Sequence, residues 1–411
     1  MAPHYAAHRV CTSVRDMRVD IVTKEYPPEV YGGAGVHVTE LVAALRERID
    51  VAVRAFGAGR DEAGTTSYGV PDGLAGANAA IQTLGTDLEI VGDVAGADVV
   101  HSHTWYANFA GHLAGLLHGI PHVVTAHSLE PLRPWKAEQL GGGYAVSSYI
   151  EKTAYEGAAA IVAVSEGMRQ DILRSYPSLA PEKVRVIYNG IDVESWRPVD
   201  DPALLERYGI DPGRPSVVFV GRITRQKGLP YFLRAAERLP DDVQIVLCAG
   251  APDTPQIMAE VQELVRGLQS QRDGVVWIEE FLQRDELCAI LTAATTFVCP
   301  SVYEPLGIVN LEAMACGAAV VGTATGGIPE VVVDGVTGRL VPIEQVQDGT
   351  GTPIDPERFV SDLAATLTEV VSDPERARAY GAAGRARAAD DFSWQAIADA
   401  TAALYREVTG K

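Results

Sequence analysis

The segment 299–317 contains the two acidic residues with the clearest chemical pattern. Glu304 follows the apolar run that ends at Cys299, and Glu312 lies 312 − 304 = 8 residues further on. If Pro305 starts a helix and Gly317 ends it, the two backbones differ by about 12 Å along the helical rise. The carboxylates of a retaining glycosidase need about 5 Å. The spacing therefore predicts two separate contacts on one ligand. The alternatives are that Glu304 caps the helix and Glu312 is a surface charge.

The segment 221–228 contains cations in the place where a phosphate site is expected. It reads GRITRQKG and comes directly after the apolar run 217–220, so Arg222 and Lys227 lie at the carboxyl end of a predicted strand. Cations in this position can hold a diphosphate and neutralise the charge that develops when it leaves. The chain has a formal net charge of −20, so an anion site requires cations gathered locally. The alternative is a solvated loop.

A glycine-rich loop follows the first predicted strand. Gly32, Gly33 and Gly35 precede a predicted helix, an arrangement that allows backbone N–H groups to approach a phosphate. The spacing is not G-x-G-x-x-G, and no G-x-x-x-x-G-K-[ST] motif occurs in the chain, which disfavours a dinucleotide dehydrogenase and a P-loop enzyme. The glycines are equally compatible with a tight turn.

Histidines follow two other apolar runs. His101 and His103 form an H-x-H pair, but no third metal ligand occurs at a recognisable spacing, and Asp-x-Asp is absent. We therefore predict no metal. His127 is either a hydrogen-bond partner of a sugar hydroxyl or a packed core histidine. All nine histidines lie at or before His127, whereas the cationic and acidic candidates lie beyond Gly221, so a site that uses both lies between two domains.

Composition excludes several classes of protein. The 411 residues suit two domains, and no apolar run is long enough to span a bilayer. The acidic balance argues against nucleic-acid and membrane partners. Five cysteines without C-x-x-C pairing indicate a reducing cytoplasm. Residues 1–16 lack the apolar stretch of a secretory signal and are expected to be a disordered leader.

Short apolar runs alternate with helical patterns in two successive series, which predicts an α/β fold of two facing Rossmann-like, doubly wound domains with an interdomain cleft. A turn-rich segment over 189–215 separates the two series. Asp355 and Ser393 are predicted N-caps of closing helices. The predicted strands contain the runs 19–22, 51–53, 99–100, 122–124, 161–164, 217–220, 245–247, 275–278, 296–298 and 319–321.

Taken together, these motifs resemble the retaining glycosyltransferases of the GT-B fold, family 4 type, which include sucrose synthases and bacterial glycogen synthases. The motifs are the Glu304-x7-Glu312 block, the loops 221–228 and 32–35, and the terminal Phe392-Ser393-Trp394. The segments 24–38 and 126–136 resemble the actinobacterial glycogen-synthase type. The resemblance implies an acceptor-binding domain over 17–200, a nucleotide-sugar-binding domain over 201–390, and a terminal helix over 391–411 that packs on the first domain.

The resemblance also implies roles for individual residues. Arg222 and Lys227 would hold the donor diphosphate, with a backbone contact from Gly33. Glu304 would bind the transferred sugar and Glu312 the ribose. The remaining implied contacts are those of the backbone N–H groups of Leu306 and Gly307 with phosphate or sugar oxygens, and of His127 with the glucosyl ring.

The implied reaction is metal-free glucosyl transfer from ADP-glucose, a substrate, to glucose 1-phosphate, which makes α-maltose 1-phosphate for α-glucan synthesis. ADP-glucose-dependent glycogen synthases have Lys-x-Gly-Gly-Leu, whereas Val30 stands at the lysine position here. Arg133 and Lys136 place two cations around Trp135, which suits a sugar phosphate; the alternative is that they pair with Glu130 or Glu138.

Three other functions remain open at this point. Elongation of an α-1,4-glucan is the main alternative. A sugar-nucleotide 2-epimerase shares the architecture but needs no acceptor pocket, and a catalytically inactive binder does not need Glu304, Arg222 and Lys227 together. The donor base, ADP or UDP, is not decided by the sequence. A monomer or a homodimer is expected.

Overall fold

The computed structural model describes residues 17–411, and the expected leader 1–16 lies outside the described residues. The first half of the chain forms a seven-stranded sheet in the order β3-β2-β1-β4-β5-β6-β7, and all neighbours are parallel. Its strands are β1 (Arg18–Thr23), β2 (Asp50–Phe56), β3 (Thr65–Tyr68), β4 (Val99–His103), β5 (His122–Ala126), β6 (Ala160–Ala163) and β7 (Val184–Val186).

The second half forms a six-stranded parallel sheet in the order β10-β9-β8-β11-β12-β13. Its strands are β8 (Ser216–Arg222), β9 (Gln244–Gly250), β10 (Val275–Ile278), β11 (Thr296–Cys299), β12 (Ala319–Thr323) and β13 (Gly338–Val341). Both sheets are doubly wound, which confirms the predicted fold class. The strands not predicted, β3, β7 and β13, are short edge strands whose sequences lack a continuous apolar run.

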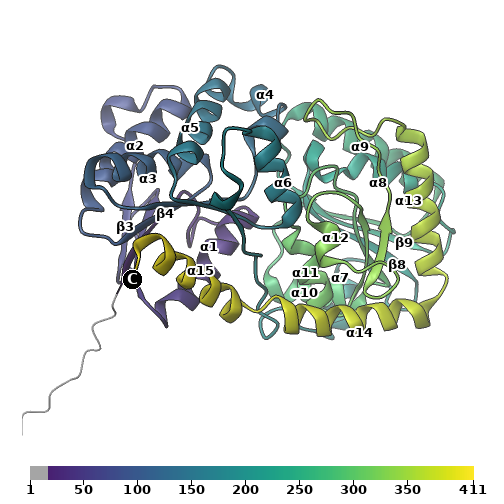
Figure 1. The fold of residues 1–411 in the computed structure, drawn as a ribbon. Coiled ribbons are helices and arrows are strands. Elements are labelled where there is room, and N and C mark those ends of the chain that lie inside the picture. The colour runs from purple at the N-terminus through teal and green to yellow at the C-terminus, as the bar shows by residue number, and fades with distance from the viewer. Residues whose placement is uncertain (1–16) are drawn as a thin grey trace, which may run out of the picture.

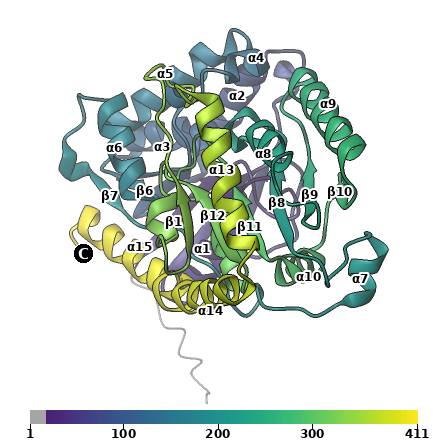
Figure 2. The same ribbon diagram turned by 90° about the vertical axis from the view of Figure 1, so that its right-hand side faces the viewer.

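Helices cover both faces of each sheet, as Figures 1 and 2 show from two directions. In the first domain they are α1 (Gly33–Arg46), α2 (Ala79–Asp93), α3 (Trp105–His118), α4 (Lys136–Leu140), α5 (Gly143–Gly157) and α6 (Glu166–Ser175). Those that follow are α7 (Pro202–Arg207), α8 (Leu229–Ala236), α9 (Pro255–Gln271), α10 (Arg284–Ala293), α11 (Ile308–Ala315), α12 (Ile328–Val331), α13 (Pro356–Val371), α14 (Pro374–Asp391) and α15 (Trp394–Thr409). Within 17–411, no helix is both long and apolar enough to cross a bilayer.

The last three helices connect the two domains. The side chain of Asp355 accepts the N–H of Arg358 at the start of α13, and that of Ser393 accepts the N–H of Ala396 at the start of α15, so both predicted caps are confirmed. In Figure 1, α14 runs along the second domain and α15 lies on the first domain beside α1. Tyr405 of α15 is fully buried there, and its hydroxyl lies 2.6 Å from His101 Nδ1.

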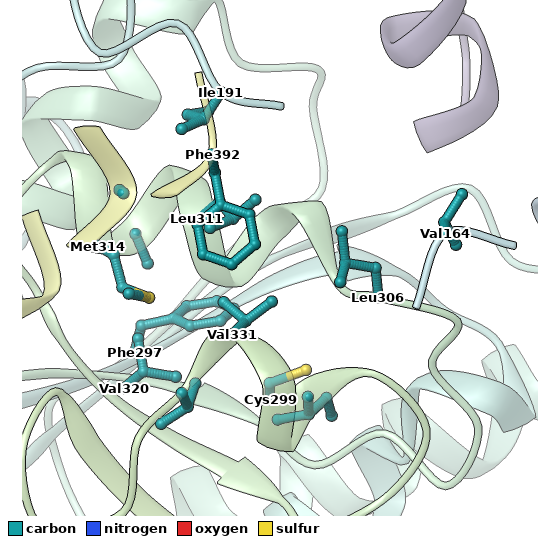
Figure 3. Close-up of a cluster of buried hydrophobic side chains, with 14 of the residues drawn as sticks. Val164, Ile191, Phe297, Cys299, Leu306, Leu311, Met314, Val320, Val331 and Phe392 are labelled. Atoms are coloured by element: carbon teal, nitrogen blue, oxygen red, sulfur yellow. The ribbon is translucent and has the colours of Figure 1, made fainter. Parts of the chain in front are cut away.

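A continuous hydrophobic core crosses from one domain into the other. Figure 3 shows Val164 of the first domain beside Leu306 of the second, and Ile191 beside Phe392 at the end of α14. The N–H of Ile191 donates to the carbonyl of Phe392 at 2.7 Å. The domains therefore contact each other through packed side chains as well as through the chain connections, and this packing fixes the geometry of the cleft.

The helix after β11 differs from the sequence prediction. It begins at Ile308, after Gly307 in a left-handed conformation (φ 90°), and not at Pro305. The expected end is close to the prediction, since Cys316 caps the helix and Gly317 has φ 86°. Because 304–307 is a loop, the helical estimate of about 12 Å between the two glutamates does not apply. Glycine adopts the left-handed conformation readily, so Gly307 can turn the chain just before the helix. The preference of proline for the first helical position had suggested the earlier start.

Candidate active site

Two loops of the second domain lie against each other at the carboxyl ends of adjacent strands. β8 leads into the loop with Lys227, and β11 leads into the loop with Glu304. The N–H of Val302 donates to the carbonyl of Gln226 at 2.9 Å. Gly228 has φ 65°, and a Cβ there would overlap the carbonyl oxygen of Pro300. A glycine is thus required both by the backbone conformation and by the close approach of the two loops.

Lys227 and Glu304 form an ion pair in which Nζ lies 2.7 Å from Oε2. The same carboxylate oxygen accepts the hydroxyl of Ser301 at 3.0 Å. Burial opposes the charge of Lys227, but the nearby carboxylates of Glu304 and Glu312 contribute to raising its pKa, so this lysine stays cationic. Glu304 caps no helix, which removes that alternative, and its carboxylate is buried beside a fixed cation.

Arg222 lies at the end of β8 and pairs with Asp253, at 2.6 Å between Nη2 and Oδ1. Its side chain is about half exposed, so the guanidinium remains open to a ligand from the cleft. Its charge also reaches the first domain, where it acts on Glu25 and Tyr31 of the loop before α1. The two predicted diphosphate ligands thus lie in one loop, one held by Glu304 and the other by Asp253.

The turn before α11 presents unused donors. Within residues 17–411, the backbone N–H groups of Leu306 and Gly307 donate no hydrogen bond to the protein. N–H groups in front of a helix N-terminus are favourable positions for phosphate or sugar oxygens. Gly33 lies opposite this turn, because a Cβ there would be 3.7 Å from Cδ1 of Ile308. The glycine loop of the first domain and the helix start of the second therefore face each other.

Glu25 explains how the glycine loop keeps its shape. Its carboxylate accepts the N–H groups of Tyr31 (3.2 Å) and Gly32 (2.8 Å). A Cβ on Gly35 would collide with the Glu25 side chain, so this glycine is needed for packing. Glu25 is not among the site residues predicted from the sequence. A carboxylate that follows a strand and precedes a glycine loop is the signal that could have found it.

Glu312 lies on α11 and is partly buried, not a surface charge. Burial raises its pKa to about 7, although Lys227 and Arg284 oppose the shift. Near neutral pH this side chain is therefore divided between the acid and the carboxylate.

His127 belongs to a cluster of imidazoles at the carboxyl ends of β4 and β5, in the middle of the first sheet. Its Nε2 lies 3.0 Å from Nδ1 of His103, and the ring of His37 from α1 packs against both rings. Burial, and the neighbouring imidazoles of His37 and His101, hold the pKa of His127 well below its usual value. It is therefore neutral at physiological pH, in the form that exchanges hydrogen bonds with hydroxyl groups.

The histidine cluster forms a group of three imidazoles that the sequence spacing did not indicate. His103 has no further ligand near it in the sequence, but His37, His103 and His127 bring ring nitrogens within 4.8 Å of one another, a geometry that can hold a metal ion. The ring of His37 is buried, and the side chain of Asn189 is the polar group that acts on it. The sequence missed this group because its members come from three separate elements.

Arg133 and Lys136 lie in positions that differ from the prediction. Lys136 is buried, 3.9 Å from the fully buried Glu130, and its Nζ lies 5.6 Å from the ring centroid of Tyr106. Arg133 donates to Ser128 Oγ at 2.9 Å. Trp135 instead lines a cavity of about 430 Å³ with residues of the second domain. Lys136 thus pairs with Glu130, the alternative that the sequence had left open, and lies near Tyr106 rather than around Trp135.

Direct hydrogen bonds between the two domains fix their relative position. Ser165 caps α6 and donates to the carbonyl of Pro305 at 2.5 Å. The carboxylate of Glu330 accepts the N–H groups of Glu166 and Gly167, each at 2.8 Å. The N-terminus of a first-domain helix is thus capped by the second domain, which couples the domain arrangement to the Glu304 loop.

The chain has two facing Rossmann-like domains. One side of the cleft carries paired cations and free N–H groups, and the other carries a neutral histidine. This arrangement defines a glycosyltransferase of the GT-B type. The model of Glycosyltransferase Family 4 matches residues 31–195, and that of Glycosyl transferases group 1 matches residues 214–368. The chain belongs to glycosyltransferase family 4.

Similar proteins with names indicate which members of the family this chain resembles. An alpha-maltose-1-phosphate synthase of Mycolicibacterium smegmatis is 57% identical over 96% of this chain and 100% of its own length. One from Mycobacterium tuberculosis is 55% identical over 95% of this chain and 100% of its own length. Among solved structures, the sucrose-phosphate synthase of Thermosynechococcus elongatus has a TM-score of 0.76 at 23% identity, covering 96% of this chain and 99% of its own, which shows the shared fold.

We expect Arg222→Ala and Lys227→Ala each to lower kcat/KM by roughly 10² or more, because each removes one preorganised charge from the leaving diphosphate. Initial rates over a range of donor concentrations measure the effect. Arg238→Ala is the matched control, since this exposed arginine of the second domain pairs with Glu357 of α13. Near-normal turnover in both test variants would remove the two cations from the active site.

Glu312 generates a pH prediction. A carboxylate accepts both ribose hydroxyls better than a protonated acid, so donor binding should strengthen as the pH rises through about 7. Titration calorimetry with ADP-glucose and no acceptor should show up to about a tenfold tighter Kd at pH 8 than at pH 6, since that interval spans the titration. Glu312→Gln should bind more weakly and lose the pH dependence. An unchanged pH dependence in the variant would assign the titration to another group.

Proposed function

We propose that this enzyme transfers glucose from ADP-glucose to glucose 1-phosphate, releasing ADP and forming α-maltose 1-phosphate. The observation that carries the proposal is the concentration of cations on the first domain. The charge of Arg133 acts on Lys136, and Asp253 of the second domain also acts on Lys136, in a chain of net charge −20. A neutral glucan end does not need paired cations, whereas a sugar phosphate does. The names of the 55–57% identical relatives support the same product.

In the proposed mechanism, Arg222, Lys227, the N–H groups of Leu306 and Gly307, and a backbone contact from Gly33 hold the donor diphosphate. Lys227 is tied to Glu304, so the group that orients the glucosyl hydroxyls and the group that neutralises the leaving phosphate move together. Glu312 would accept the ribose hydroxyls. His127, kept neutral by its surroundings, would hydrogen-bond the glucosyl ring.

Transfer then occurs on one face of the sugar through an oxocarbenium-like state. The bond between the anomeric carbon and the β-phosphate oxygen breaks, and a bond to O4 of glucose 1-phosphate forms. The proton of the O4 hydroxyl passes to the departing diphosphate. The contribution of the protein is charge stabilisation, positioning and exclusion of water.

We propose a metal-free reaction in a cytoplasmic enzyme. Arg222 and Lys227 provide the positive charge that a metal would otherwise supply to the diphosphate, which supports a metal-free reaction. The four cysteines within 17–411 are buried and free, which supports a reducing compartment. Cys11 lies outside the described residues.

Acceptor choice tests the function. Purified enzyme is incubated with ADP-glucose or UDP-glucose and with glucose 1-phosphate or glycogen, and the products are identified by mass spectrometry and chromatography. We expect glucose 1-phosphate with ADP-glucose to give the highest kcat/KM and a non-reducing disaccharide phosphate. If glycogen is the better acceptor, polymer elongation becomes the preferred function.

Chelation tests the metal-free mechanism. Treatment with EDTA followed by gel filtration should leave kcat/KM unchanged, and adding divalent ions back should not raise it. Elemental analysis of the purified enzyme provides the parallel measurement, since the His37, His103 and His127 group is the place where an ion would be retained. Loss of activity that a divalent ion restores would overturn the proposal.

A further inference from the structure

Two lysines contact the ring of one tyrosine at the carboxyl edge of the first sheet. The Nζ of Lys24 lies 3.9 Å from the ring centroid of Tyr106, and that of Lys136 lies 5.6 Å from the same centroid. Lys24 directly follows β1, and Tyr106 is the second residue of α3, just after β4. β1 and β4 are neighbours, with Thr23 in register with His103, so the strand order itself brings these residues together.

This concentration of positive charge is costly in the absence of an anion. Burial lowers the pKa of Lys24 below its usual value, and burial together with the charge of Arg133 lowers that of Lys136 to about 8. Arg133 Nε is buried without a hydrogen-bond partner within 17–411. Glu25, next to Lys24, is engaged by backbone N–H groups of the glycine loop. Glu130 and Glu151 compensate Lys136 in part, whereas Lys24 and Arg133 form no ion pair within 17–411.

The cluster faces the donor site across the cleft. Asp253, the partner of Arg222, acts on the charge of Lys136, and Arg222 acts on Glu25 beside Lys24. An anion held here belongs to the first domain, and the donor diphosphate belongs to the second. The distinction matters because the proposed acceptor has its own phosphate.

We propose that Lys24 and Tyr106, which were not among the predicted acceptor residues, complete with Arg133 and Lys136 the site that binds the phosphate of the acceptor sugar. This proposal rests on the proposed function and specifies its acceptor specificity. The flexible stem of Lys24 allows the ammonium to move from the ring to a phosphate oxygen, and the phenol of Tyr106 adds a hydrogen-bond donor. The lysines then contact an anion in a dry site, where such bonds are strong.

Lys24→Gln tests the proposal most directly, because Lys24 is only partly buried and forms no ion pair within the described residues. We expect the KM for glucose 1-phosphate to rise at least about tenfold, while the KM for ADP-glucose changes by less than about twofold. Lys24→Arg keeps the charge and should recover most of the affinity. Lys152→Gln, an exposed lysine on α5 of the same domain, is the matched control and should behave as wild type.

A second acceptor separates recognition from structural damage. Methyl α-glucoside has the same reacting hydroxyl and no phosphate, so Lys24→Gln should lower the preference for glucose 1-phosphate over methyl α-glucoside, measured as the ratio of kcat/KM values. An equal effect on both acceptors, or no effect on either, would overturn the assignment of Lys24. If the wild-type enzyme fails to use glucose 1-phosphate at all, the proposed function itself is wrong, and that outcome is distinct from the first.

Discussion

The contact between Lys227 and Glu304 is the interaction on which the site depends. A lysine and a carboxylate at 2.7 Å in a partly buried position join the loop after β8 to the loop after β11, two adjacent strands of one sheet. Removing either partner would leave the other charge uncompensated, which is far more costly than the pair itself. The backbone must bring the loops close enough for this contact, and Gly228 makes that approach possible against Pro300. The geometry of the donor side thus follows from one ion pair and one glycine.

The two sides of the cleft differ in charge, because one carries ionised side chains and the other neutral imidazoles. The second domain keeps its charges ionised by pairing them, as with Arg222 and Asp253. The first domain keeps its imidazoles neutral by burying them together, and His127 is held neutral by the same effect. A neutral hydrogen-bonding surface suits a sugar ring, and paired charges suit a diphosphate. In a chain with net charge −20, an anion site requires local cations, and Arg222 and Lys227 supply them in one loop.

The domain interface links this division to the overall fold. Glu330 of the second domain caps α6 of the first, and Ser165 of the first domain bonds Pro305 next to Glu304. The hydrophobic core continues between the same segments, as Figure 3 shows for Val164 and Leu306. The chain crosses back through α14 and α15, and Tyr405 of α15 reaches His101 beneath the histidine cluster. The final helix therefore packs against the first domain directly behind the histidine cluster.

Local sequence determined most of the framework. Apolar runs bounded by turn residues predicted ten of the strands, and Asp355 and Ser393 predicted two helix starts, because side-chain period and capping depend on neighbours along the chain. The same local reading singled out Arg222, Lys227 and Glu304, because each lies at or just after the end of a strand. Glu312 was singled out by its spacing from Glu304. Only the tertiary structure decided which groups meet. Lys24 reaches Tyr106, and His37 joins His103 and His127, because strand order places β1 beside β4 and β4 beside β5. Strand order is set by packing between distant segments, so spacing along the chain does not contain it.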